Sequence, residues 1–175
     1  MINSKEKIIK YFHSGIKENK NFKIGIEHEK FLFTNNNTRI DYSKIKEMFT
    51  ALLEFGWKPM IEKGNIIGLT KSGKNITLEP GNQIELSGEK LNNIHEACAE
   101  SQDYLFELRQ VTQKLNIQIV SAGFDPISKL NEIPNNPKKR YILMTQDMPL
   151  GGELSLDMMY RTCGTQLNID YSSEE

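Results

Sequence analysis

Hydrophobic and polar residues alternate along several stretches of the chain, and this period of two predicts β-strands with two different faces. The first strand is expected from about Phe22 to Thr34, and the short runs KPMIE, IIGLT, NITLE and QIELS follow it. Because the breaks KGN, KSGK and PGN contain the residues of tight turns, the four short runs are expected to form an antiparallel meander. Two further strands are predicted at 117–124 and 159–171.

A period near 3.6 residues marks the helices between these strands. Ser4 is suited to cap a short helix that ends near Gly15, and a second helix is expected at 43–55, with Gly56 as its stop. A long helix is predicted at 89–115 and a short one at 138–146. The expected apolar stripe of the long helix comprises Leu91, Ile94, Cys98, Leu105, Leu108 and Leu115. Hairpins with helices between them indicate an α+β fold, an antiparallel sheet backed by helices.

One face of the predicted sheet is rich in acids and amides. Residues two apart in a strand share a face, so Glu27 and Glu29 lie opposite Ile24, Ile26 and Leu32. The same arrangement recurs with Thr77 and Glu79, with Gln83, Glu85 and Ser87, and with Thr162, Gln166, Asn168 and Asp170. A sheet with one solvated face produces this alternation as well. The scarcity of cations favours a second interpretation, a floor whose carboxylate repulsion is offset by Mg²⁺ or, alternatively, Mn²⁺.

The composition does not indicate a nucleic-acid-binding or membrane protein. The 175 residues suit one domain, and 22 basic and 23 acidic side chains give a formal net charge of −1. No apolar run approaches the roughly 18 residues of a membrane span. With two cysteines and no apolar leader, we expect a cytoplasmic location. The oligomeric state is left open.

Familiar catalytic motifs are absent from the sequence. It contains no phosphate-binding P-loop, no dinucleotide-binding glycine motif and no G-x-S-x-G elbow. His28 alternates away from Glu27, so we interpret it as structural, with metal ligation as the alternative. Cys98 is expected to fill space on the buried stripe, and Cys163 to face the aliphatic side of its strand.

Seven blocks of the sequence carry a resemblance to a known family. They are GIEHEKF, KGNIIGLT, ITLEPGNQIELSG, IHEACAE, GFDP, RYILMTQDMP and DMMYRTCGTQLNIDYSSE. In this order, from about Phe22 to the last residue, they resemble the motifs of the plant and proteobacterial type of glutamate–cysteine ligase. The resemblance implies a fold similar to the catalytic domain of glutamine synthetase, with an antiparallel sheet as the floor of the active site.

The resemblance also implies an activity. Members of that family use ATP to phosphorylate the γ-carboxylate of glutamate, and the amine of cysteine then displaces the phosphate in the first step of glutathione synthesis. Mg²⁺ ions, bound largely by glutamates, bridge the phosphates. The implied partners are therefore the small molecules glutamate, cysteine and ATP, with no nucleic acid and no membrane.

Site residues follow from the resemblance by position. The implied metal ligands are Glu27, Glu29, Glu79, Glu85 and Gln166. The implied substrate-binding residues are Arg140, Arg161, Thr165 and Asn168. Arginine offers a planar fork for oxyanions, although a structural ion pair behind the sheet is an equal alternative for Arg161. No residue is assigned a catalytic or nucleotide-binding role.

Two departures from the family pattern matter. Asn82 stands where a small residue is usual, which the turn tolerates because asparagine accepts a left-handed backbone. The resemblance covers the whole chain but less than half of a typical member. Residues 1–175 are therefore expected to be the N-terminal part of a single catalytic domain, with an incomplete fold. The rival hypothesis is a truncated, non-catalytic module that binds metal or glutamate, or a fragment that needs a second chain.

Overall fold

The computed structural model of the protein describes residues 4–173 and shows a seven-stranded antiparallel sheet with five α-helices. The strand order is β2–β3–β4–β5–β1–β6, and β7 also pairs with β1. The strands are β1 Ile24–Thr34, β2 Lys58–Glu62, β3 Asn65–Lys71, β4 Lys74–Glu79, β5 Gln83–Ser87, β6 Ile117–Val120 and β7 Thr165–Ile169. The α+β class and the antiparallel meander predicted from the sequence are confirmed.

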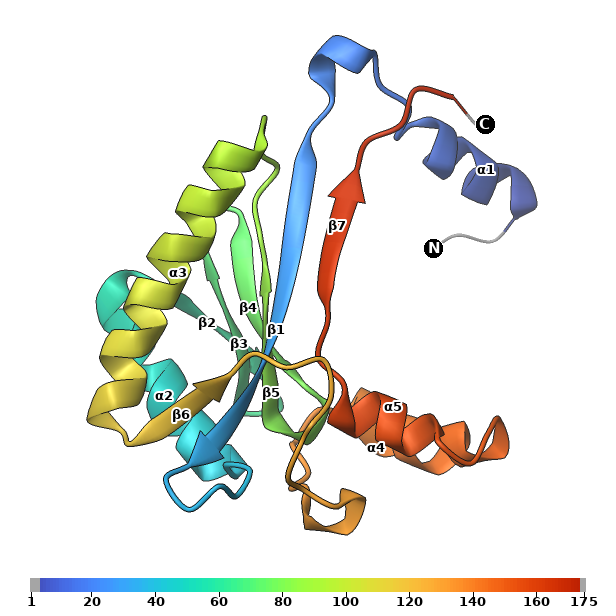
Figure 1. Cartoon of the computed structure of the whole chain (residues 1–175). Helices are drawn as coiled ribbons and strands as arrows, with labels where there is room; N and C mark the ends of the chain where they lie inside the picture. Colours follow the sequence, from blue (N-terminus) through green and yellow to red (C-terminus); the bar gives the residue numbers. More distant parts are fainter. Residues whose placement is uncertain (1–3, 174–175) are drawn as a thin grey trace.

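Strand β1 organises the sheet (Figure 1). Strand β5 pairs along one of its edges, and the other edge is shared by two strands. Strand β7 pairs with residues 24–28 of β1, and β6 pairs with residues 31–34. At the junction between them, the Glu29 amide donates a hydrogen bond of 3.0 Å to the Gly164 carbonyl. The two halves of β1 therefore face different neighbours on this edge.

The helices divide between the two faces of the sheet. Their bounds are α1 Lys5–His13, α2 Tyr42–Leu52, α3 Ile94–Lys114, α4 Lys139–Asp147 and α5 Ser155–Arg161. Helices α2 and α3 cover one face, whereas α4 and α5 lie together at the opposite side of the molecule (Figure 1). The fully buried residues of the main core include Leu32, Ile45, Phe49, Leu69, Ile76, Leu78, Ile84, Leu86 and Leu108. The main hydrophobic core of the molecule thus lies between the sheet and helices α2 and α3.

Local signals in the sequence end or begin elements where they were expected. The Ser4 hydroxyl accepts a hydrogen bond from the Lys7 amide at the start of α1. A 3₁₀ turn, Leu53–Phe55, follows α2, and Gly56 stops it with a φ of 85°. Asn82 has the left-handed φ of 59° that the turn requires, as predicted. Its buried side chain donates a hydrogen bond of 2.9 Å to the Ile40 carbonyl.

Helix α3 begins later than predicted, and its buried face differs from the predicted stripe. Asn93 caps it by accepting from the amides of His95 and Glu96, while Leu91 pairs with Ile24 as an isolated bridge. The prediction that Cys98 is buried is wrong, because its side chain is exposed. The residues of α3 that are buried are Ala97, Glu100, Tyr104, Leu108, Val111 and Thr112.

The predicted strand at 159–171 is wrong over its first half. Residues 155–161 form α5, in which Asp157 and Arg161 make an ion pair of 2.8 Å one turn apart. Such a pair supports a helix locally, and strand pairing starts only at Thr165. Strand β6 is also shorter than its predicted range, because it ends at Val120.

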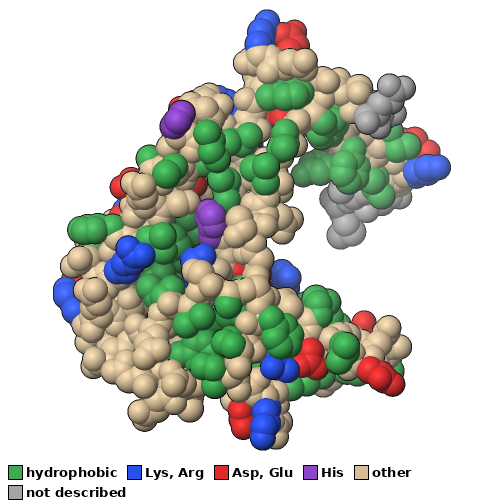
Figure 2. All heavy atoms as spheres, viewed as in Figure 1, with side chains coloured by type: hydrophobic (Ala, Val, Ile, Leu, Met, Phe, Trp, Pro, Cys, Tyr) green, Lys and Arg blue, Asp and Glu red, His purple; other side chains and the backbone are tan. Residues whose placement is uncertain are grey.

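Helix α1 lies away from the main core and has no buried residue. It is held next to the end of β7, where the Tyr171 hydroxyl donates to the Phe12 carbonyl and Lys17 pairs with Asp170 at 2.5 Å. Figure 2 shows the surface hollowed between α1 and the α4–α5 pair. None of the helices within residues 4–173 is both long and apolar enough to cross a membrane.

Candidate functional site

The predicted acidic face exists, and the strand register shows how it is assembled. Glu29 of β1 lies directly opposite Glu85 of β5, and Glu85 lies opposite Thr77 of β4. On the other edge of β1, Glu27 lies opposite Gln166 of β7. Directly opposite residues of antiparallel strands project on the same side of the sheet. Four strands, β1, β4, β5 and β7, therefore contribute to one polar surface. We call it the glutamate face; it comprises Glu27, Glu29, Glu79, Glu85 and Gln166.

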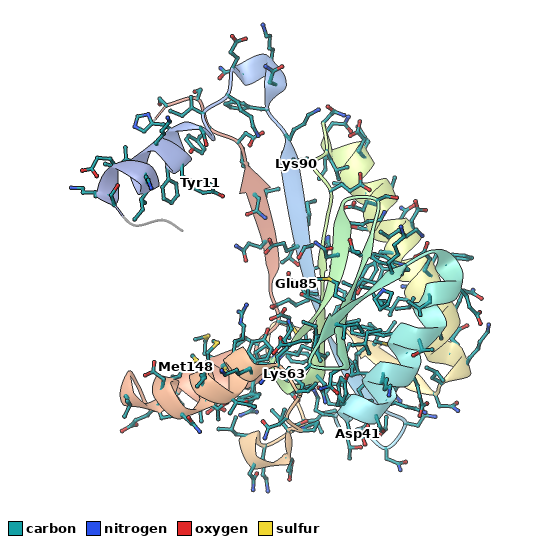
Figure 3. All side chains as sticks on the ribbon, turned by 180° about the vertical axis from the view of Figure 1, so that it is seen from behind. Tyr11, Asp41, Lys63, Glu85, Lys90 and Met148 are labelled. Atoms are coloured by element: carbon teal, nitrogen blue, oxygen red, sulfur yellow. The ribbon has the colours of Figure 1, made fainter. Side chains whose placement is uncertain are left out.

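Alternation within each strand produces this face. Ile76, Leu78, Ile84 and Leu86 alternate with the acids, and all four are 0% exposed on the side of α2 and α3. Burying these side chains is favourable, so the helices fix which way β4 and β5 turn. The intervening polar side chains then project to the opposite side. Figure 3 shows Glu85 on the sheet, with Met148 marking the α4–α5 region on the side away from α2 and α3.

Each carboxylate of the face accepts a hydrogen bond from a nearby group. Asn168 donates to Glu27 at 3.2 Å, the Gly164 amide donates to Glu29 at 2.5 Å, and Ser87 donates to Glu85 at 2.6 Å. Glu79 accepts from Thr77 at 2.8 Å and from the Tyr141 hydroxyl. The donors orient the carboxylates, while each acid keeps further lone pairs that can bind a cation.

The four glutamates differ in how their charge is compensated. The Lys138 ammonium lies 3.7 Å from Glu79. Among residues 4–173, no lysine or arginine forms a salt bridge with Glu27, Glu29 or Glu85. Three acids of the face are therefore left with negative charge that another positive group has to offset.

Burial and mutual repulsion shift the pKa values of two of these acids. Burial raises the pKa of Glu29, the Gly164 hydrogen bond lowers it, the charges of Glu79 and Glu27 raise it further, and the charge of Lys30 lowers it. Burial likewise raises the pKa of Glu85, with additional increases from Glu79, Glu27 and Glu29 and a decrease from its bond to Ser87. The acids are thus close enough to oppose one another's ionisation, and burial adds to that cost.

A cavity of about 190 Å³ joins the glutamate face to α4 and α5. Glu29 and Glu79 line it together with Arg140 and Tyr141. The Arg140 guanidinium carbon is 5.1 Å from the centre of that ring. The rest of the wall is formed by Pro80, Gln83, Met144, Met148, Met158, Met159 and Thr162. The cavity therefore combines two carboxylates and one exposed arginine in an otherwise largely apolar space.

Three predicted substrate-binding residues, Arg161, Thr165 and Asn168, are not among those that line this cavity. Arg161 belongs to α5, where it pairs with Asp157, donates 3.3 Å to the Asp125 carbonyl and lies over the Phe124 ring at 4.3 Å. These contacts match the alternative of a structural ion pair, and a substrate-binding role for Arg161 stays a prediction. Thr165 lies opposite His28, on the other face of β1, and lines a separate pocket beside Glu29 and Lys30.

His28 and Cys163 have structural contacts. The His28 ring contacts the Ser101 hydroxyl of α3 at 3.0 Å, on the face opposite the glutamates, as predicted. Cys163 is buried and donates to the Gln83 side chain at 3.1 Å. Burial, followed by the charge of Glu29, raises the pKa of the Cys163 thiol to about 12, so the thiol stays protonated near neutral pH.

The donor chemistry of the glutamate face fits Mg²⁺. Its ligands are all oxygen, and within residues 4–173 no three His, Cys, Asp or Glu side chains converge into a complete metal cage. Mg²⁺ is commonly bound by one or two carboxylates, with water and substrate phosphates completing its octahedron. Separated glutamates beside a cavity of about 190 Å³ are compatible with that mode of binding.

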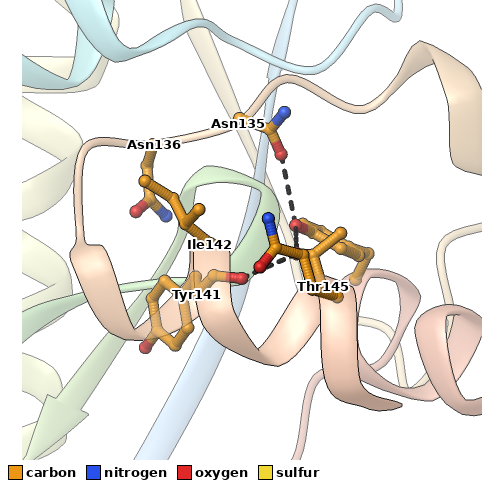
Figure 4. A pocket seen from close by; sticks show the side chains of 7 residues that line it. Asn135, Asn136, Tyr141, Ile142 and Thr145 are labelled. Atoms are coloured by element: carbon orange, nitrogen blue, oxygen red, sulfur yellow. Dashed lines mark hydrogen bonds between the residues drawn. The ribbon is translucent and has the colours of Figure 1, made fainter. Parts of the chain in front are cut away.

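A second cavity, of about 320 Å³, lies on α4 next to the Asn135–Asn136 loop (Figure 4). Tyr160 is fixed there by hydrogen bonds of 2.6 Å to Thr145 and 3.2 Å to Asn135. Its lining is formed by asparagine, glutamine, threonine, tyrosine and isoleucine side chains, without a charged one. Anionic substrates and metal ions need charged partners, so the smaller cavity with Glu29 and Arg140 is the better candidate site.

Sequence reasoning missed several residues that build the site. Lys138 and Tyr141 contact Glu79, and Asn136 donates 2.9 Å to the Glu79 carbonyl. Arg39 and Asp125 form a fully buried ion pair of 2.9 Å. Asp125 lies in the GFDP block, which pointed to its importance, whereas nothing local to Arg39 indicates a partner 86 residues away.

Comparison with known proteins identifies the family. Residues 23–175 match the model of glutamate-cysteine ligase family 2 (GCS2). The chain is 42% identical over 174 residues to glutamate–cysteine ligase A, chloroplastic, of Oryza sativa subsp. japonica, which covers 98% of this chain and 35% of the relative. It is also 42% identical over 173 residues to the chloroplastic glutamate–cysteine ligases of Nicotiana tabacum and Arabidopsis thaliana, covering 98% of this chain and 33% of each.

These relatives correct one prediction and set the scope of the others. The cytoplasmic location predicted from the sequence is contradicted, because the relatives are named as chloroplastic proteins. The chain spans about a third of the length of the curated relatives it matches. With a family match over residues 23–175 and the acidic sheet face in place, this chain belongs to glutamate–cysteine ligase family 2.

Proposed function

We propose that this chain carries the metal- and substrate-binding floor of a glutamate–cysteine ligase, the enzyme of the first step of glutathione synthesis. The observation that carries the proposal is the glutamate face, with Glu29 and Glu79 sharing a cavity with Arg140. Family membership supplies the reaction class, and the relatives are named for the two amino acids that they join.

The proposed reaction proceeds through a γ-glutamyl phosphate. A γ-carboxylate oxygen of glutamate attacks the terminal phosphorus of ATP, and ADP leaves. The amine of cysteine then attacks the γ-carbonyl carbon, loses a proton and expels phosphate. The products are γ-glutamylcysteine, ADP and phosphate, and negative charge accumulates on phosphate oxygens in both steps.

The glutamate face would hold the cations that this chemistry requires. Bound Mg²⁺, or alternatively Mn²⁺, would neutralise phosphate oxygens and draw electron density from the transferring group. Glu27, Glu29 and Glu85 are the best supported ligands, because they have no cationic side chain paired with them in the described chain. Glu79 is already engaged by Lys138 and Tyr141. Gln166 faces Glu27 and would add a neutral oxygen.

The basic and amide side chains would bind the amino-acid substrate. Arg140 is exposed on α4 and lines the cavity, so its planar guanidinium can bind a carboxylate in two-point fashion. Asn168 hydrogen-bonds Glu27 and lies at the margin of the face. The proposed roles of Thr165 and Arg161 are weaker, since one lies on the opposite face and the other is engaged by Asp157.

A second candidate function is a non-catalytic module that binds metal or glutamate, alone or with a second chain. The observation that favours it is the cavity lining, because two carboxylates and an arginine can bind a cation or an amino-acid carboxylate without any reaction. Both candidates use the same glutamate face, and they differ in whether product forms.

An activity assay separates the two candidates. The purified chain is incubated with ATP, Mg²⁺, glutamate and cysteine, and γ-glutamylcysteine is measured by mass spectrometry. Product that disappears with Glu29→Gln and persists with the exposed-site control Glu54→Gln supports the ligase. Calorimetric binding of Mg²⁺ or glutamate without product, lost in Glu29→Gln, supports the module. A chain that neither forms product nor binds either ligand contradicts both.

A further inference from the structure

Arg39 lies at one end of the glutamate face. The row of side chains along β1 that contains Glu27 and Glu29 continues with Phe31 and Phe33. The Arg39 guanidinium carbon is 4.8 Å from the centre of the Phe31 ring and 5.7 Å from that of Phe33. The side chains of Arg39 and its partner Asp125 are fully buried. This arginine therefore closes the acidic row without being accessible to solvent itself.

One guanidinium holds three segments that are distant in the sequence. Nη2 donates 2.5 Å to the Gly81 carbonyl in the turn between β4 and β5. Nη1 donates 2.9 Å to the Asp125 carboxylate and 3.5 Å to the Tyr160 carbonyl in α5. The directions of these bonds require the planar fork of arginine, which a lysine ammonium does not provide.

Each of the three segments leads directly to the candidate site. Gly81 follows Glu79 by two residues, and the turn is tight, because a Cβ there would lie 2.6 Å from the Ile133 side chain. Tyr160 precedes Gly164, whose amide binds the Glu29 carboxylate at 2.5 Å. The guanidinium therefore connects the supports of two acids that contribute to the same cavity.

Asp125 begins the third segment, the loop that leads to α4. Its carboxylate accepts 2.9 Å bonds from the amides of Ile127 and Ser128, so it fixes the loop as well as Arg39. The loop then contacts the Glu79 region through Asn136 and Lys138. It ends at α4, the helix that presents Arg140 to the cavity.

From this geometry we propose that Arg39 is a positioning residue for the candidate site. By holding the Gly81 turn, the Asp125 loop and the end of α5 together, it sets the spacing of Glu79, Arg140 and Glu29. That this spacing serves metal and substrate binding rests on the proposed function. The contacts of Arg39 with the three segments, which we call the clamp, do not depend on it. Arg39 contacts neither metal nor substrate in this role.

The test compares Arg39→Lys with a destabilising core variant on the other side of the sheet, Leu52→Ala. Leu52 is fully buried in α2 and belongs to the main core. The double variant Arg39→Met/Asp125→Leu removes both buried charges and replaces Arg39→Lys should that variant fail to fold. All are made in a Cys98→Ser background, so that Cys163 is the single thiol, and all are measured below their unfolding temperatures.

Two readouts are taken from each protein. Mn²⁺ affinity, followed by electron paramagnetic resonance, reports on the spacing of the glutamates. The rate of Cys163 labelling by a thiol-reactive aromatic disulfide reports on the segment after Tyr160, because Cys163 is buried against Gln83. Removal of the clamp is expected to weaken Mn²⁺ binding at least tenfold and to speed labelling at least tenfold, whereas Leu52→Ala changes each less than twofold.

The outcomes distinguish the clamp from the proposed function. Unchanged Mn²⁺ affinity in the Arg39 variants, or an equal loss in Leu52→Ala, overturns the positioning role. If the parent protein binds no Mn²⁺, the proposed function fails and the labelling rate decides the clamp. In that case a selective increase in the Arg39 variants supports it, and an unchanged rate overturns it.

Discussion

The two faces of the sheet come from one alternating pattern but have opposite physical character. On one side Ile76, Leu78, Ile84 and Leu86 are sealed under α2 and α3. On the other side Glu29 and Glu85 lie directly opposite each other, and neither is paired with a cation in the described chain. The first face is stabilised by its own contacts. The second stores a repulsion that burial makes worse, which is a cost to folding unless a ligand offsets it.

The buried Arg39–Asp125 pair lies at one end of the glutamate face, beside Phe31. We predict that Asp125→Ala there has the largest effect of the changes considered, a loss of about 3–5 kcal/mol in the free energy of unfolding, because it leaves a buried guanidinium without its counter-charge. The matched control Asp157→Ala removes a partly exposed helical pair and is expected to cost about 0.3–0.5 kcal/mol. Chemical denaturation measures both, and equal losses would contradict the distinction.

On the apolar face, Leu86→Ala is expected to cost about 2–5 kcal/mol, because it leaves a cavity beneath α2 and α3. The control is Leu167→Ala on β7, where the leucine is 55% exposed and the expected change is within about 0.5 kcal/mol. Urea unfolding compares the two. A small loss for Leu86→Ala would mean that the face is not a packed core.

On the acidic face, Glu85→Gln is predicted to act in the opposite direction. It removes a like charge directly opposite Glu29, so without metal at neutral pH the protein is expected to gain roughly 0.2–1 kcal/mol of stability. Added Mg²⁺ should stabilise the parent protein more than this variant. Thermal unfolding with a chelator measures the stability change of the variant, and unfolding with Mg²⁺ measures how much the ion stabilises each protein. A variant that is less stable than the parent protein without metal would refute the repulsion.

The smallest predicted effect is a pH dependence. Folding raises the pKa values of Glu29 and Glu85, so the folded state holds their protons to a higher pH than the unfolded state does. Their contribution to stability is therefore lost as the pH rises from about 4.3, the ordinary value for glutamate, through the raised values. In a Glu29→Gln/Glu85→Gln variant this loss should be absent. Unfolding curves measured with a chelator at several pH values test the difference, and identical profiles would contradict it.

Local pattern was enough to predict the two faces. A strand has a fixed period, so the alternation of Glu27, Glu29 and Glu85 with aliphatic residues determined which side each occupies. Helix α5 was missed because a short apolar run such as DMMY suits a strand or a helix, and the Asp157–Arg161 pair decides for the helix. Cys98 was misplaced because the predicted stripe followed the leucines, whereas the face of α3 that is buried carries Ala97, Glu100 and Tyr104.

The supports of the site were less accessible to sequence reasoning. Arg39 contacts Gly81, Asp125 and Tyr160, which are 42, 86 and 121 residues away along the chain. Such contacts depend on how whole helices and strands pack, so the local pattern of hydrophobic and polar residues does not predict them. Lys138 was likewise part of an expected helix, although its ammonium reaches the Leu78 carbonyl and lies near Glu79.

The most direct test of the account is a Mn²⁺ titration of the chain, followed by electron paramagnetic resonance. We predict saturable binding to the parent protein, at least tenfold weaker binding to Glu29→Gln, and unchanged binding to Glu54→Gln, an exposed glutamate on the helical side. Absence of binding to the parent protein, or equal affinity in both variants, would contradict the assignment of the glutamate face as the metal-binding floor.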